Sequence, residues 1–164
     1  MKKIVIFYSE YIPLIDAIKY QLQETAEVFC FQNFDDCKEI NAYDLVVSCH
    51  YKGNIDCEYL DSYFSLLPMY QGKNPIKQAI EDGVKVTGIT IYYKKNRKIL
   101  AQYPIFVNND IHYELLKQKL EYIEQIIYPY VIYKILMNEQ FDIQAFMKNG
   151  KTCSSNCKEC TGCH

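Results

Sequence analysis

A segment near the start of the chain decides its fold class: KIVIFY, residues 3–8, in which Lys3 is followed by an unbroken run of β-branched and aromatic residues. Such a run, without polar alternation, is typical of a strand buried on both faces of a parallel sheet. Pro13, a residue suited to the first turn of a helix, is followed by apolar residues at helical spacing. Residues 26–31 read as the next strand. This strand–helix–strand order predicts a right-handed crossover between parallel strands, and therefore an α/β fold.

The same patterns predict the remaining elements. Further strands are expected at residues 45–49, 84–93 and 99–107, and a loop is expected at residues 65–68, after the segment 59–63. The polar residues 94–98 between the last two strands indicate a hairpin. Helices are expected at residues 75–81, ending at Gly83, and from Ile111 to Leu136, where Pro129 would restart or kink the helix.

Composition excludes several classes of protein. A length of 164 residues favours one domain, and a hydrophobic content of 49% argues against disorder. The 18 basic and 20 acidic residues lack the excess of positive charge typical of nucleic-acid binders. No apolar run approaches the roughly 20 residues of a membrane-spanning helix, and the first residues lack the pattern of a signal peptide. A cytoplasmic protein is therefore expected.

Several motifs occur in an order that resembles one family. They are SLLPMYQG at residues 65–72, VTGITI at 86–91, ILAQ at 99–102 and the helical segment 121–133. Together they resemble the formyltransferases that use 10-formyltetrahydrofolate, which include glycinamide ribonucleotide, methionyl-tRNA and sugar N-formyltransferases. The resemblance covers most of residues 1–138. It implies a Rossmann-like, mostly parallel sheet with helices on both faces, in a trimmed form because the connection at residues 33–43 is short. We expect this domain at residues 1–149 and a cysteine-rich tail at residues 150–164.

The catalytic positions of that family are occupied by other residues in this chain. Where the family has Asn-x-His before SLLP, the chain has Asp61 and Tyr63. The family's Asp falls on Lys95, or on Asn96 after a shift of one residue. The resemblance implies that Asp61, Tyr63 and Lys95 occupy the active site. An ionised Asp accepts hydrogen bonds only, and a phenol with a pKa of about 10 is a poor proton shuttle at neutral pH. Lys95 could stabilise negative charge or pair with Asp61, and an Asp61–Lys95 ion pair is expected.

The turn after the strand at residues 45–49 corresponds to the border of the family's folate pocket. The resemblance therefore implies that His50, Tyr51, Lys52 and Ile55 bind the pterin of the folate. His50 is a possible replacement for the missing base, although a His at a strand end is more often structural. The family's nucleotide-binding members carry a glycine-rich phosphate turn after the first strand, where this chain has no glycine and carries Glu10. Glycinamide ribonucleotide is therefore not an expected substrate.

Four cysteines gather near the end of the chain: Cys153, Cys157, Cys160 and Cys163. Thiolates two or three residues apart can bind one metal ion or cluster. The crowded spacing suits an iron–sulfur cluster or zinc, and copper(I) stays open. Disulfides or an unliganded, redox-labile tail are the alternatives.

These observations lead to two functional hypotheses. The first is a divergent formyltransferase, a one-carbon transferase that passes a formyl group from 10-formyltetrahydrofolate to a small-molecule amine. The second is a catalytically lapsed formyltransferase fold that binds a ligand and senses metal or redox state through its cysteine tail. The sequence leaves the amine acceptor and the oligomeric state open.

Overall fold

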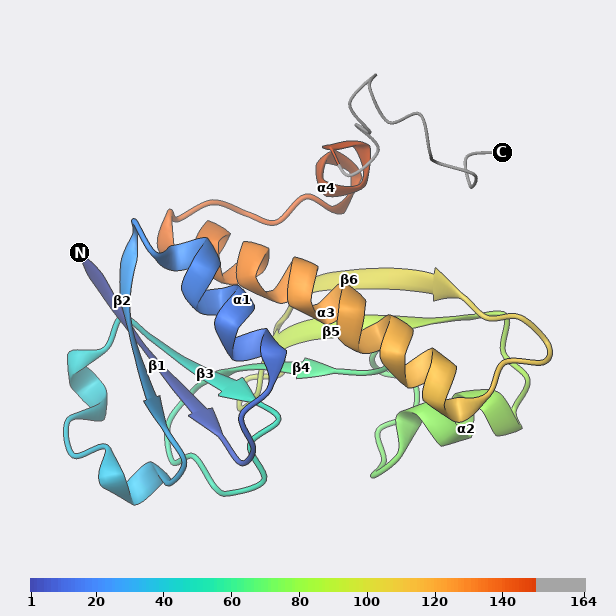
Figure 1. Cartoon of the computed structure of the whole chain (residues 1–164), viewed down its shortest axis with the longest axis horizontal. Coiled ribbons are helices and arrows are strands. Elements are labelled where there is room, and N and C mark those ends of the chain that lie inside the picture. The colour runs from blue at the N-terminus through green and yellow to red at the C-terminus, as the bar shows by residue number, and fades with distance from the viewer. Residues whose placement is uncertain (150–164) are drawn as a thin grey trace.

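The computed structural model describes residues 1–149, which form a six-stranded sheet with helices packed against it (Figure 1). The strand order is β2-β1-β3-β4-β5-β6. The strands are β1 (Lys2–Tyr8), β2 (Ala26–Phe31), β3 (Leu45–Cys49), β4 (Leu60–Tyr63), β5 (Val86–Tyr93) and β6 (Ile99–Phe106). Strands β2, β1, β3 and β4 pair in parallel, and β5 is antiparallel to both β4 and β6. The predicted α/β fold, the mostly parallel sheet and the β5–β6 hairpin are confirmed.

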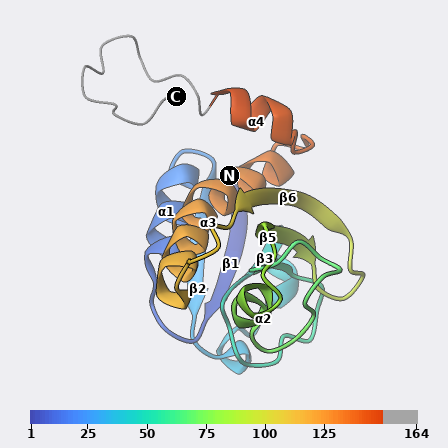
Figure 2. The same cartoon turned by 90° about the vertical axis from the view of Figure 1, so that its right-hand side faces the viewer.

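Two helices cover one face of the sheet: α1 (Pro13–Leu22) and α3 (Tyr113–Leu136). Figure 2 shows them side by side. Their apolar residues meet Ile4 and Ile6 of β1 in the larger core. α3 runs as one helix through Pro129, so the helix does not restart at this proline.

The opposite face of β1 is also buried, by different means. Val5 and Phe7 alternate with Ile4 and Ile6, and all four side chains have 0% exposure. Val5 and Phe7 belong to a second, smaller core, against which the short connection between β2 and β3 packs. That connection folds into two 3₁₀ helices, Phe34–Asp36 and Ile40–Ala42. The sequence predicts the double burial of β1, but not these two short helices.

Two further helices complete the described part of the chain. α2 (Pro75–Glu81) is capped by Asn74, whose side chain accepts a hydrogen bond from the amide of Lys77, and Gly83 follows it at a positive φ of 63°. α4 (Ile143–Asn149) packs through Phe146 against Tyr103 of β6. Among residues 1–149, no helix has the length and apolar character needed to cross a bilayer. The predicted tail, residues 150–164, lies outside the described residues.

Candidate active site

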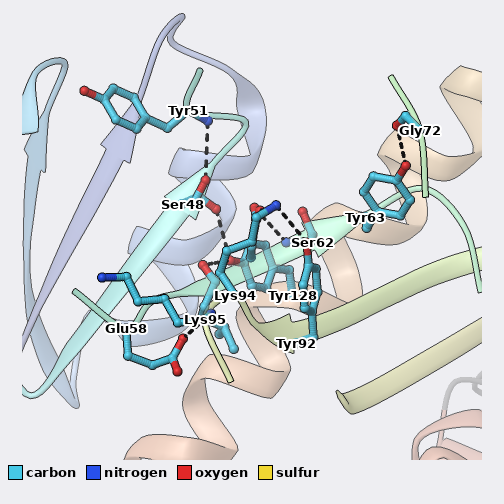
Figure 3. Close-up of polar contacts among 12 residues, drawn as sticks. Ser48, Tyr51, Glu58, Ser62, Tyr63, Gly72, Tyr92, Lys94, Lys95 and Tyr128 are labelled. Carbon is cyan, nitrogen blue, oxygen red and sulfur yellow. Dashed lines mark hydrogen bonds and ion pairs between the residues drawn. The ribbon is translucent and has the colours of Figure 1, made fainter. Parts of the chain in front are cut away.

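Adjacent strands β4 and β5 bring three polar side chains together (Figure 3). Asp61 lies directly opposite Tyr92 in the antiparallel register, and Lys94 follows two residues beyond Tyr92. Because side chains alternate along extended chain, Tyr92 and Lys94 point to the same face. The ammonium group of Lys94 lies 3.3 Å from Oδ2 of Asp61 and donates to the hydroxyl of Tyr92 at 3.0 Å.

The electrostatics of this cluster favour a cationic Lys94. Burial raises the pKa of Asp61 above its ordinary value, and the positive charge of Lys94 opposes that shift. Burial acts to lower the pKa of Lys94, but the hydrogen bond to Tyr92 and the charge of Asp61 outweigh it and raise that pKa. Lys94 is therefore a hydrogen-bond donor with a persistent positive charge at neutral pH, rather than a proton shuttle.

A cavity of about 210 Å³ lies beside this cluster. Its lining includes Tyr63, Tyr92, Lys94 and Arg97. Arg97 donates a hydrogen bond to the side chain of Gln71, which also lines the cavity. The cavity thus combines two cationic groups with aromatic walls.

Lys95 lies outside this cluster. Its ammonium group is 3.5 Å from Oδ1 of Asp56, and both side chains are exposed. The backbone amides of Lys95 and Asn96 both donate to the carboxylate of Glu58. The expected Asp61–Lys95 ion pair is therefore wrong: the alternation of β5 directs Lys94, and not its neighbour, toward Asp61.

Tyr63 supports the neighbouring loop at residues 65–72. Its hydroxyl lies 2.6 Å from the carbonyl oxygen of Tyr70 and 2.5 Å from that of Gly72. These contacts join the end of β4 to the loop while the ring of Tyr63 lines the cavity. The Tyr63 hydroxyl is therefore engaged with the backbone of the loop and helps to hold the loop in place.

The motif residues of β5 and β6 hold the first half of the same loop. The hydroxyl of Thr90 donates to the carbonyl of Ser65 at 2.6 Å and accepts from the amide of Leu67 at 2.9 Å. The side-chain amide of Gln102 donates to the carbonyl of Leu67 at 2.8 Å. The separate sequence motifs at residues 65–72, 86–91 and 99–102 therefore form one hydrogen-bonded unit that shapes a cavity wall.

The four residues predicted to bind the pterin do not surround one cavity. Ile55 is 2% exposed in the smaller core, and Tyr51 packs there against Phe7. Lys52 is exposed. His50 lies on the α3 side of the sheet, where Nε2 is 2.8 Å from Oε2 of Glu124. The sequence alone does not indicate a role for Glu124, because its partner His50 lies 74 residues away along the chain.

The chemistry of 10-formyltetrahydrofolate can be compared with the cavity at Lys94. A reduced folate has flat rings, carboxylates and a polar formyl oxygen. Tyr63 and Tyr92 offer aromatic walls, and Lys94 and Arg97 offer cationic donors. A second cavity, of about 440 Å³, lies along the same β5–β6 hairpin and is lined in part by Tyr93 and Asn96. The residues present fit the chemical groups of a folate.

The predicted metal site belongs to the cysteine-rich tail. Among residues 1–149, no three His, Cys, Asp or Glu side chains are grouped so as to hold a metal ion. The predicted ligands Cys153, Cys157, Cys160 and Cys163 lie outside the described residues.

Comparison with known proteins relates the sequence to formyltransferases. A sequence model described as formyl transferase matches residues 54–132. Methionyl-tRNA formyltransferase of Halalkalibacterium halodurans is 43% identical over 65 residues, covering 37% of this chain and 20% of that protein. Phosphoribosylglycinamide formyltransferase of Bacillus subtilis is 36% identical over 76 residues, covering 44% of this chain and 39% of that protein. The matched segments thus span less than half of the length of these relatives.

Solved structures show the same fold over more of the chain. Phosphoribosylglycinamide formyltransferase from Bacillus halodurans has a TM-score of 0.68 and 22% identity, over 82% of this chain and 95% of that one. A 4-N formyltransferase from Francisella tularensis has a TM-score of 0.71 and 20% identity, over 85% of this chain and 71% of that one. The resemblance is therefore confirmed: residues 54–132 carry the sequence pattern of the formyl transferase family, and the described chain has the formyltransferase fold.

Proposed function

We propose that this protein transfers a formyl group from 10-formyltetrahydrofolate to an amine at the cavity beside Lys94. The observation that carries the proposal is the ammonium group of Lys94, held by Asp61 and Tyr92 at the cavity wall. When bound, the folate supplies the formyl group. Attack of an amine on a formyl carbon places negative charge on the formyl oxygen, and a fixed cation at that point lowers the barrier.

The chain's own residues take separate roles in this proposal. Lys94 stabilises the developing negative charge, in the role that the sequence suggested for Lys95. Asp61 is a positioning residue, because it contacts Lys94 from a site where only 15% of its side chain is exposed. Tyr63 shapes the cavity through its bonds to the loop at residues 65–72.

The test compares two adjacent lysines. Lys94→Met and Lys95→Met remove the same charge at neighbouring positions, so they form a matched pair. The reaction is followed as amine-dependent conversion of 10-formyltetrahydrofolate to tetrahydrofolate, with a panel of small primary amines as acceptors. We expect Lys94→Met to lower kcat by about 10²-fold or more, the effect of losing one preorganised donor to an oxyanion. Lys95→Met should be within about twofold of the wild type, the scale of an exposed charge.

Two controls make the comparison interpretable. Circular dichroism and thermal melts establish that each variant is folded. Binding of a formyl-folate analogue that cannot transfer its formyl group separates folate affinity from chemistry. Equal loss of rate in both variants would contradict the assignment of Lys94, and no transfer by the wild type to any amine would contradict the function.

The cysteine tail and the cellular location remain separate proposals. The four tail cysteines stay candidate ligands for iron–sulfur or zinc, to be checked by metal content per chain in the protein with and without those cysteines. The four cysteines of the described residues, Cys30, Cys37, Cys49 and Cys57, are free thiols. Free thiols suit a reducing compartment, which supports the proposed cytoplasmic location.

A further inference from the structure

The 164 residues contain one arginine, Arg97, which lies in the turn of the β5–β6 hairpin. Its backbone has a φ of 60°, in the left-handed region that favours glycine or asparagine. An arginine in this conformation costs free energy, and such costs are concentrated at functional sites. The side chain lines the cavity of about 210 Å³ at Lys94. The position of Arg97 therefore indicates a role for its side chain in that cavity.

The guanidinium group of Arg97 has a neutral partner. It donates to Oε1 of Gln71, whose Nε2 donates in turn to the carbonyl of Pro68 at 2.9 Å. Among residues 1–149, no Asp or Glu forms an ion pair with Arg97. A guanidinium has five N–H donors in a planar fork that matches the two oxygens of a carboxylate. The amide oxygen of Gln71 uses one of these donors and leaves the positive charge uncompensated.

The charges at the cavity sum to one positive charge within the described chain. Lys94 is paired with Asp61, whereas Arg97 has no acidic partner there. The other residues of the lining are uncharged: Tyr63, Leu67, Gln71, Gly72 and Tyr92. A carboxylate carries one negative charge and would balance the charge of Arg97. A phosphate group, with a charge of about −1.5 to −2 at pH 7, would exceed it.

Lys94 and Arg97 line one small cavity. A carboxylate bound to Arg97 would therefore lie close to the formyl group that the proposed function places at Lys94. In 10-formyltetrahydrofolate, the benzoyl ring stands between N10 and the carboxylates of the glutamate. With the formyl group at Lys94, these carboxylates would lie outside a cavity of this size. The amine acceptor is the reactant that can carry a carboxylate beside its reacting nitrogen.

We propose that Arg97 is a specificity-determining residue that selects an acceptor amine carrying a carboxylate. This inference rests on the proposed function and names the substrate class of the same site. The two carboxylate oxygens accept hydrogen bonds from the guanidinium in place of the amide oxygen of Gln71. Asp61 and Tyr92 use two of the three N–H donors of Lys94 and leave one for the formyl oxygen. Amino acids with a short spacing between amine and carboxylate are the class that fits this cavity.

The first experiment measures binding and does not need turnover. Because the chain has one arginine, the NMR signal of its Nε–H group needs no assignment among others. We expect glycine, β-alanine or 4-aminobutyrate to shift this signal saturably. The amide of the same compound keeps the amine without the carboxylate charge, and it should leave the signal in place at equal ionic strength. Absence of a saturable shift with all three, or tighter binding of inorganic phosphate, would overturn the proposed ligand class.

A further measurement decides whether the carboxylate belongs to the acceptor or to the folate. The titration with the amino acid is repeated in the presence of a saturating formyl-folate analogue that cannot transfer its formyl group. We expect the amino acid still to shift the Arg97 signal, because the folate carboxylates lie elsewhere. Loss of the shift would show that the folate occupies Arg97, and it would overturn the role of Arg97 toward the acceptor.

The second experiment measures selectivity with matched acceptors. For each amino acid and its amide, the ratio of the two kcat/KM values is compared between variants, so that differences in amine basicity cancel. Arg97→Met should lower this ratio by about 10- to 100-fold, the scale of hydrogen bonds to a charged group. Arg97→Lys keeps the charge without the fork, so its ratio should be intermediate. Lys98→Met is the matched control at the wild-type ratio, since it removes the adjacent charge, which lines a different cavity.

The outcomes separate this inference from the proposed function. Formyl transfer with an unchanged ratio in Arg97→Met would overturn the role of Arg97 and leave the proposed function standing. A shift of the Arg97 signal by the amino acid, without transfer by the wild type to any amine, would contradict the proposed function. It would also overturn the assignment of the carboxylate to a formyl acceptor.

Discussion

Asp61 and Ser62, consecutive residues of β4, hold charged partners on opposite faces of the sheet. Asp61 pairs with Lys94 of the β5–β6 hairpin at 3.3 Å, and Ser62 donates to the buried Glu124 of α3. The alternation of one short strand thus divides a cation from a His–Glu pair. The two ion pairs therefore lie on opposite faces of the sheet and are joined only through the backbone of β4.

The Asp61–Lys94 pair should affect stability as well as activity. Lys94→Met leaves a nearly buried carboxylate without its cation, so we expect a loss of about 1–3 kcal/mol in the free energy of unfolding at neutral pH. Lys95→Met breaks only an exposed contact and should cost less than about 0.5 kcal/mol. Chemical denaturation of both variants measures this difference.

The loss in Lys94→Met should depend on pH in a defined direction. Burial raises the pKa of Asp61 in the folded protein, and removing Lys94 raises that pKa further. The folded state then binds a proton more tightly than the unfolded state, so stability falls as pH rises through this range. The difference between wild type and Lys94→Met should therefore be larger at pH 7 than at pH 4. A difference independent of pH would show that the carboxylate is not left unpaired.

For the His50–Glu124 pair, the difference in stability between wild type and variant should shrink, rather than grow, as pH rises. Burial acts to lower the pKa of His50, but the hydrogen bond and the charge of Glu124 outweigh it and raise that pKa above the ordinary value of 6.5. Stability from this raised pKa is fully present below pH 6.5 and is lost as pH rises through the folded-state value. Denaturation of wild type and Glu124→Gln should thus show a gap that narrows from pH 6 to pH 9. His112→Gln serves as the control, and its stability should follow the wild type at every pH.

Tyr63→Phe tests whether this residue supports the loop or moves protons. The variant loses the hydroxyl contacts to the carbonyls of Tyr70 and Gly72, so we expect about 1 kcal/mol less stability and faster amide exchange at residues 65–72. Tyr20→Phe changes a side chain that is 74% exposed and should have no effect. Loss of a limb of the pH–rate profile in Tyr63→Phe would instead assign the phenol to proton transfer.

Gly88 tests the packing of the loop against the hairpin. A Cβ atom at this position would lie 2.1 Å from the carbonyl oxygen of Tyr103 and 2.7 Å from Cδ2 of Leu66. Gly88→Ala must therefore displace backbone of β6 or the loop, and we expect about 1–3 kcal/mol lower stability with weaker folate binding. Gly83→Asn is the control, since Gly83 has open space and Asn tolerates its positive φ. Equal stability of Gly88→Ala and wild type would contradict the tight contact.

The sequence by itself determined the order and type of most elements. Residues 4–7 are apolar at every position because both faces of β1 are covered, by α1 and α3 on one side and the β2–β3 connection on the other. The helical spacing after Pro13 and from Ile111 onward also predicted helices, because a helix buried on one face repeats its apolar residues every three to four positions. The motifs around Ser65, Thr90 and Gln102 indicated the family by their order along the chain. In the fold, the Thr90 hydroxyl donates to the backbone carbonyl of Ser65 and accepts from the side-chain amide of Gln102.

Only the tertiary structure decided which polar side chains meet. Lys94 and Lys95 are adjacent in sequence, and the register that places Tyr92 opposite Asp61 selects between them. Glu124 finds His50 across 74 residues, through the packing of α3 on the sheet. Tyr51 and Ile55, expected at a ligand, are instead held in the smaller core. Local periodicity follows from the chain's own geometry, whereas a site between distant segments depends on strand register and helix packing, which a single sequence does not specify.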